Sequence, residues 1–145
     1  MITIEVDQQF QDQITPLLQR LHNPAPAMRA IGAALRDSTL LRFVMQQDPY
    51  GRQWTPLSPR TIEERRKGGG VGVQILRDTG RLMNSITFNS GDDYAEIGTV
   101  VQYARDHQFG VPSRHIPIRQ IFGLSNSDQT DVFSIITHYL VGDKT

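Results

Sequence analysis

One segment, residues 27–47, constrains the fold more than any other part of the chain. One helical face is formed by Ile31, Ala34, Leu35, Ser38, Leu41 and Met45. The second half of the segment is apolar on other faces too, because Leu40, Phe43 and Val44 lie there. A helix that is apolar on several faces has to be buried on several faces. We therefore expect a long helix that is covered on two sides, within the core or against another subunit.

Length and composition limit the class of protein. The chain has 145 residues, of which 38% are hydrophobic, which suits a single domain over 1–145 with a core of its own. It has 0 cysteines, which excludes thiol catalysis, cysteine-based zinc sites and redox chemistry. No signal peptide opens the chain, and no stretch reaches the roughly 20 apolar residues of a membrane helix. These features fit a cytoplasmic protein that does not associate with membranes.

Periodicity predicts regular structure at both ends of the chain. Residues 2–6 alternate between apolar and polar side chains, which predicts a strand. Residues 10–21 carry apolar residues at helical spacing, and Pro16 either kinks that helix or starts a new one. A final helix is expected after an N-cap at Ser125 or Ser127. Its apolar stripe consists of Val132, Ile135, Ile136, Tyr139 and Leu140.

The region between the helices reads as a hairpin followed by a turn. Residues 85–89 and 95–99 alternate in the manner of strands around a Gly/Asp turn, which predicts a β-hairpin. Residues 103–109 form a turn or short helix that Gly110 stops. The whole pattern predicts an α+β fold, with helices packed on a small, mainly antiparallel sheet and a long extended arm.

The arm covers about residues 48–75. It opens with a strong turn signal at 48–51, and Ser58 followed by Pro59 is a good start for a short helix. Glycines fill four of the five positions 68–72, so a mobile loop is expected there.

Hydrophobic residues and charge make the arm a candidate interaction surface. Trp54, Leu57 and Ile62 would not stay in water on a free loop. The arm either reaches a neighbouring subunit or folds back over its own core. Residues 52–81 have seven basic and three acidic side chains, a net +4, whereas residues 82–145 have a net −3. Complementary ends of this kind favour a head-to-tail contact between copies, although a solvated loop would show the same charges.

Few side chains suggest chemistry. A hydrolase centred on His107 and Asp106 is conceivable, but no partner set surrounds them, and a structural hydrogen-bonding histidine is favoured. The glycine run lacks the Lys-Ser/Thr pair of a phosphate loop. The alternative to a structural protein is a nucleic-acid-binding module. It would use the basic residues Arg60, Arg65, Arg66 and Lys67. We predict no catalytic residue, no metal ligand and no cofactor.

Three clusters, taken in order, resemble a known family. Residues 48–61 follow the pattern D-P-x-G-x-x-W-x-P-L-S-P-x-T, and residues 75–86 follow I-L-x-x-T-G-x-L-x-x-S-I. Residues 98–125 resemble G-T-x-x-x-Y-A-x-x-H-Q-x-G followed by I-P-x-R-x-F-L-G-L-S, although Ile121-Phe122 inverts the aromatic–aliphatic order of the last pattern. These are patterns of the virion morphogenesis proteins of Mu-like phages and the related tail completion proteins. The resemblance covers about residues 1–135.

The resemblance implies a non-enzymatic role in finishing the tail or joining it to the head. From the apolar residues and charge of the arm we also hypothesise that the protein works as a ring or as part of one. It would contact neck or tail proteins and touch the genome at most transiently. The resemblance also implies a place in the virion, after assembly in the host cytoplasm. The motif residues expected to specify shape are Gly51, Gly80, Gly98, Tyr103, His107, Gly110, Arg119 and Gly123. The residues expected to make intermolecular contacts are Trp54, Leu57, Arg60, Ile62, Arg65, Arg66 and Lys67.

Overall fold

A computed structural model describes residues 8–67, 75–76 and 80–142. The helices in chain order are α1 (Gln8–Leu18), α2 (Ala25–Met45), α3 (Pro59–Lys67), α4 (Arg81–Asn84), α5 (Ala104–Phe109), a 3-10 turn η1 (Pro112–Arg114) and α6 (Asn126–Gly142). Strands β1 (Thr87–Ser90) and β2 (Ala95–Gly98) lie between α4 and α5 and form one antiparallel hairpin. The expected α+β fold, with helices on a small antiparallel sheet, is confirmed.

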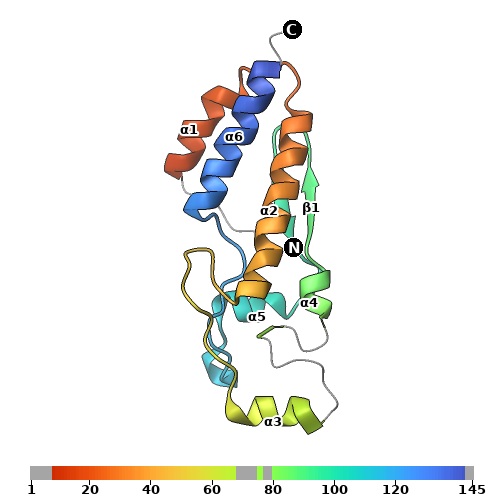
Figure 1. Cartoon of the computed structure of the whole chain (residues 1–145), viewed down its shortest axis with the longest axis vertical. Helices are drawn as coiled ribbons and strands as arrows, with labels where there is room; N and C mark the ends of the chain where they lie inside the picture. The colour runs from red at the N-terminus through yellow and green to blue at the C-terminus, as the bar shows by residue number, and fades with distance from the viewer. Residues whose placement is uncertain (1–7, 68–74, 77–79, 143–145) are drawn as a thin grey trace.

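Helix α2 is the centre of the molecule. It packs against α6 on one side and against both strands on the other, and α1 covers α6 (Figure 1). The hairpin approaches α2 closely at Gly32, where an added Cβ would lie 2.5 Å from a ring carbon of Phe88. The two-sided burial expected for this helix is therefore provided by its own chain. Its C-terminal end differs, since Leu41, Val44 and Met45 remain exposed.

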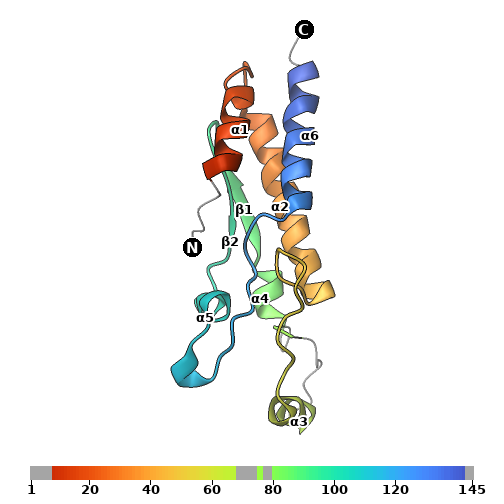
Figure 2. The same ribbon diagram turned by 90° about the vertical axis from the view of Figure 1, so that its left-hand side faces the viewer.

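Two apolar clusters fill the fold. The upper cluster joins α1, α2 and α6, and its buried members are Phe10, Met28, Ile31, Val132 and Ile136. The lower cluster joins the end of α2 to the arm, α4, α5 and the segment before α6. Its buried members are Phe43, Trp54, Ile75, Leu76, Leu82, Ile86, Val101, Ala104, Ile121 and Phe122. The molecule is elongated, with the hairpin turn at one end and α3, α5 and η1 toward the other (Figure 2).

Local signals located most elements correctly. Helix α1 continues through Pro16, so no second helix starts there. The N-cap of α3 is confirmed, because the Thr61 backbone N–H donates to Ser58 Oγ at 3.2 Å. Helix α6 is capped by Ser125, which accepts a hydrogen bond from the Asp128 backbone N–H at 2.9 Å. The strand expected at 2–6 and the mobile loop expected at 68–72 lie outside the described residues.

The first half of the arm folds back over its own core, which was one of the two expectations for it. Asp48 closes the predicted turn, accepting hydrogen bonds from the backbone N–H groups of Tyr50 and Arg52. From Trp54 onward the chain follows the segment before α6, and α3 then extends beyond the lower cluster (Figure 1). Among the described residues, no helix combines the length and apolarity needed to cross a membrane.

Candidate functional site

A cleft of about 1170 Å³ opens at the end of the molecule that carries α3 and α5. One wall is the arm at 55–58 together with Thr61 of α3, and the other is α5 with the following loop at 110–119. Leu76, Gly80, Arg81 and Leu82 complete the lining. Segments that are far apart in sequence therefore meet here, and most of the motif residues meet with them.

Trp54 fixes the arm at the point where it enters this wall. Its side chain is 3% exposed and packs edge-to-face on Phe43 of α2, with ring centroids 5.5 Å apart. Its indole Nε1–H donates to the backbone carbonyl of Gln120 at 2.8 Å, and its backbone N–H donates to Gln46 at 2.8 Å. An aromatic ring held by packing and by a hydrogen bond at its polar end has little freedom to turn.

Arg119 joins the two walls. Its Nε–H donates to the carbonyl of Thr55 at 2.8 Å and its Nη2 donates to the carbonyl of Pro56 at 3.2 Å. Its backbone N–H donates to the carbonyl of His107 at 2.7 Å. One residue on the floor of the cleft thus holds the arm on one side and α5 on the other.

Gln108 repeats this arrangement beneath α5. Its side chain is 4% exposed, and its Oε1 accepts hydrogen bonds from the backbone N–H groups of Ile121 and Phe122 at 2.8 and 2.9 Å. Its Nε2 donates to the carbonyl of Phe122 at 3.1 Å. A buried amide that satisfies backbone groups on both its oxygen and its nitrogen fixes the register of the packed segment.

Two motif glycines are required by close approach in this region. Gly110 has a φ of +74°, and an added Cβ would lie 2.8 Å from Ile118 Cγ1. An added Cβ at Gly123 would lie 2.8 Å from Pro49 Cγ. Both positions therefore exclude a side chain for steric reasons, as expected of residues that specify shape.

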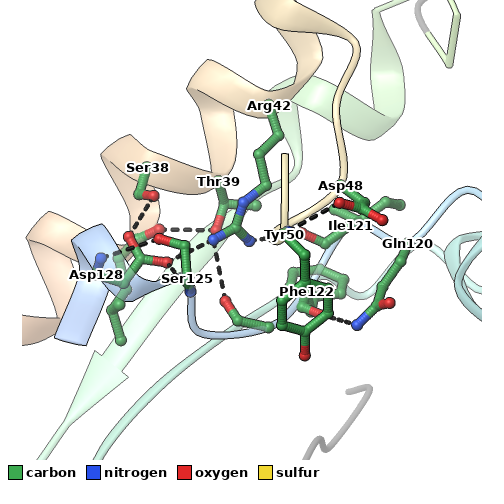
Figure 3. Close-up of polar contacts among 12 residues, drawn as sticks. Ser38, Thr39, Arg42, Asp48, Tyr50, Gln120, Ile121, Phe122, Ser125 and Asp128 are labelled. Carbon is green, nitrogen blue, oxygen red and sulfur yellow. Dashed lines mark hydrogen bonds and ion pairs between the residues drawn. The ribbon is translucent and has the colours of Figure 1, made fainter. Parts of the chain in front are cut away.

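A buried ion pair stabilises the other side of the segment that carries Arg119 (Figure 3). Arg42 Nη2 lies 2.6 Å from Asp128 Oδ2, and these side chains are only 8% and 3% exposed. The guanidinium also donates to the carbonyls of Ile121 and Gly123. The carboxylate accepts further hydrogen bonds from the Ser38 hydroxyl and the Ser125 backbone N–H. Burial lowers the pKa of Arg42, and the charge of Asp128 opposes that effect.

His107 lies on the cleft wall. Its backbone carbonyl accepts from Arg119, but its buried Nδ1 has no hydrogen-bond partner within the described chain. The carboxylate of Asp106 pairs with Arg114 at 3.2 Å instead of with the imidazole. The hydrogen-bonding role expected of this side chain therefore stays a prediction. Among the described residues, no group of three His, Cys, Asp or Glu side chains could hold a metal ion.

The protonation of His107 predicts a pH dependence of stability. Burial, followed by the charge of Arg119, lowers the pKa of His107 in the folded state, and Asp106 opposes this shift. The unfolded chain then binds a proton near the ordinary histidine pKa of about 6.5, where the folded chain does not. The free energy of unfolding should therefore fall as the pH drops from about 7.5 to 5.5.

Urea unfolding across that range, in wild type and His107→Gln, measures the effect. The variant should lose the part of the pH dependence that this imidazole contributes. His138→Gln, at an exposed position on α6, is the matched control and should keep the wild-type profile. Equal pH profiles for wild type and His107→Gln would contradict the prediction.

Comparison with known proteins identifies the family. The family model for phage virion morphogenesis proteins matches residues 5–141. The chain belongs to the phage virion morphogenesis family. The match includes every described element and both walls of the cleft, so the resemblance drawn from three short clusters is confirmed.

Individual relatives of this family member are also phage proteins. It is 36% identical over 115 residues to the putative capsid assembly protein G of Escherichia phage Mu, covering 74% of each chain. It is 29% identical over 146 residues to the Mu-like prophage FluMu G protein 2 of Haemophilus influenzae, covering 96% of each. FluMu G protein 1 of the same organism is 28% identical over 113 residues, covering 77% of this chain and 76% of the relative. No solved structure matches this chain.

The structure brings together only part of the predicted set in this family member. The predicted residues that line the cleft are Leu57, Gly80, Tyr103, His107, Gly110 and Arg119. Trp54 is buried in its own core and offers no surface to a neighbour in this structure. Arg60 and Ile62 lie on α3, where Arg60 pairs with Glu64 at 3.1 Å. The side chains of residues 65–67 lie outside the described part of the chain, so the basic segment stays a prediction.

The remaining motif glycines lie away from the cleft. Gly51 ends the turn after α2 with a φ of +84°. Gly98 is buried at the end of β2, opposite Thr87.

Sequence reasoning missed three residues that hold the site together: Arg42, Gln108 and Asp128. Two of them had a local signal. Ser125 and Asp128 have the spacing of a capping box, with reciprocal hydrogen bonds of 2.9 and 3.0 Å. Arg42 is the one charged residue in the last eight positions of α2, residues 38–45. Gln108 stands in the H-Q-x-G pattern, but nothing local marks a glutamine that will be buried.

Proposed function

We propose that this protein is a non-enzymatic structural component of a phage or prophage, which completes the tail or joins it to the head. It acts through ring-like self-assembly and through contacts with neck or tail proteins. The virion is assembled in the host cytoplasm. The proposed place is the tail or the head–tail junction. Transient contact with the genome through α3 stays a secondary expectation.

The observation that carries this proposal is that the motif side chains bind the protein's own backbone. The side chains of Arg119 and Gln108 form hydrogen bonds with backbone carbonyl and N–H groups, and Gly110 leaves space for Ile118. Groups committed in this way hold a surface in shape. A surface whose shape is fixed in this way loses little conformational freedom when a protein partner binds it.

Exposed apolar side chains at the cleft support the same reading. Phe109 and Ile118 line it and are 55% and 63% exposed, and Tyr103 is 38% exposed. Large apolar side chains gathered at one concave site are typical of a surface that a partner covers. The name of the Mu relative, a putative capsid assembly protein, also supports a role in particle assembly.

A charge placed in this surface tests the proposal. Ile118→Glu should leave folding intact, because the side chain is already 63% exposed. It should lower the yield of infectious particles by about tenfold or more, because assembly would bury an unpaired carboxylate. Val141→Glu on α6 is the matched control, since that residue is also 63% exposed.

Electron microscopy of the lysate distinguishes the outcomes. Complete heads beside separate tails, or tails with defective ends, are expected for Ile118→Glu. Normal numbers of joined, infectious particles would overturn the proposal. Loss of the heads themselves would also overturn it, in favour of a role in capsid assembly.

A further inference from the structure

The described residues that line the cleft carry charge of one sign. Arg81 and Arg119 are among them, and no aspartate or glutamate is. The Arg81 guanidinium lies over the Tyr103 ring, 6.0 Å from its centroid. An occupant of this cleft should therefore combine apolar or aromatic surface with negative charge.

The hairpin turn at the opposite end of the molecule has this chemistry. It carries Asp92 and Asp93, both exposed, next to Tyr94, which is 44% exposed. Neither carboxylate makes an ion pair within the described part of the chain. These are two of the seven acidic residues in 82–145, of which Asp128 is buried in an ion pair and Asp106 pairs with Arg114.

The hairpin turn is also stabilised by contacts of its own. The Gly91 N–H donates to the carbonyl of Tyr94 at 3.0 Å, which closes the turn. The Tyr94 ring lies directly against Gly91, where an added Cβ would overlap it. A preformed tip with one aromatic side chain loses little conformational entropy on binding.

We propose that the hairpin turn of one copy, residues 91–94, binds in the cleft of the next copy. Tyr94 lies against Phe109 and Ile118 at the cleft mouth, and Asp92 and Asp93 face the basic lining. This contact rests on the self-assembly in the proposed function and assigns it a donor and an acceptor. The turn lies toward one end of the elongated fold, and α3 and α5, which contribute residues to the cleft, lie toward the other (Figures 1 and 2), so the contact is head-to-tail. A repeated contact of this kind closes into a ring when the rotation between subunits permits.

Disulfide trapping tests the contact directly, because the chain has 0 cysteines of its own. A double variant, Asp93→Cys with Ile118→Cys, places one thiol on the turn and one at the cleft mouth. Mild oxidation of particles carrying this variant, and of the purified full chain at high concentration, should give a ladder of covalent oligomers on a non-reducing gel. The matched control is Asp93→Cys with Val141→Cys, which should give no ladder.

A charge exchange provides the second readout. Asp92→Arg with Asp93→Arg, or Arg81→Glu alone, should lower the yield of infectious particles by about tenfold or more through like-charge contact. Combining all three substitutions should restore most of the yield of infectious particles. A ladder that exceeds the control, together with this rescue, would support the contact.

The two proposals fail in different ways. Particles that are sensitive to Ile118→Glu but give no ladder above the control would overturn the hairpin contact, and the proposed function would stand. Insensitivity to Ile118→Glu would overturn the proposed function. Failure of the charge exchange to rescue the yield would also count against the contact between copies.

Discussion

Asp128→Asn should lower the free energy of unfolding by about 3–5 kcal/mol, because it leaves the Arg42 guanidinium buried without its counter-charge. The native carboxylate accepts hydrogen bonds from Arg42, Ser38 and Ser125, and it is 3% exposed. Asparagine keeps the volume but turns one acceptor into a donor that faces other donors. The melting temperature should fall on the order of 10 °C.

Thermal and urea unfolding followed by circular dichroism measure this effect. The matched control is Glu64→Gln, which breaks the Arg60–Glu64 pair on α3, where the side chains are 89% and 65% exposed. Exposed pairs contribute little, so this variant should unfold like the wild type. In an Arg42→Met background, Asp128→Asn should lower the free energy of unfolding by clearly less than it does in the wild type. The reason is that the buried Arg42 charge is no longer present. A loss as small as that of Glu64→Gln would show that the buried pair does not stabilise the fold.

Trp54→Ala should lower the free energy of unfolding by a similar amount, about 3–5 kcal/mol. The indole is 3% exposed in the lower cluster, packs on Phe43 and donates to the carbonyl of Gln120. Its removal leaves a large cavity and releases the arm from the core. Since the arm forms one wall of the cleft, the variant should also become sensitive to proteases between about residues 48 and 58.

Two further variants separate the contribution of the Trp54 hydrogen bond from that of its packing and provide a control on the same arm. Trp54→Phe keeps most of the packing but leaves the Gln120 carbonyl without its donor, so about 1–3 kcal/mol should be lost. Tyr50→Ala, at a position on the same arm that is 60% exposed, should have little effect on unfolding. Protease resistance in Trp54→Ala equal to that of the wild type would contradict anchoring of the arm by this side chain.

The sequence by itself determined the elements whose signals are local. The apolar period of residues 27–47 located α2, although the helix begins at Ala25 because prolines at positions 24 and 26 fit its first turn. Ser58 marked the start of α3, and alternation around a Gly/Asp turn located β1 and β2. These patterns work because helix and strand periods, caps and turns depend on residues only a few positions apart.

The same locality explains where the sequence left alternatives open. Whether Trp54 faced a neighbour or its own core could not be decided, since both environments favour a large apolar side chain. Only the tertiary structure assigns it to Phe43 and Gln120, the latter 66 residues away.

The cleft and its supports were decided by the tertiary structure. Arg42 and Asp128 are 86 residues apart, Arg119 and Thr55 are 64 apart, and no short-range pattern links either pair. A polar side chain that will be buried looks like any other polar residue until its partner is known. The partner is set by how α2, α6 and the arm pack, and the free energy for bringing such distant groups together comes from the whole core.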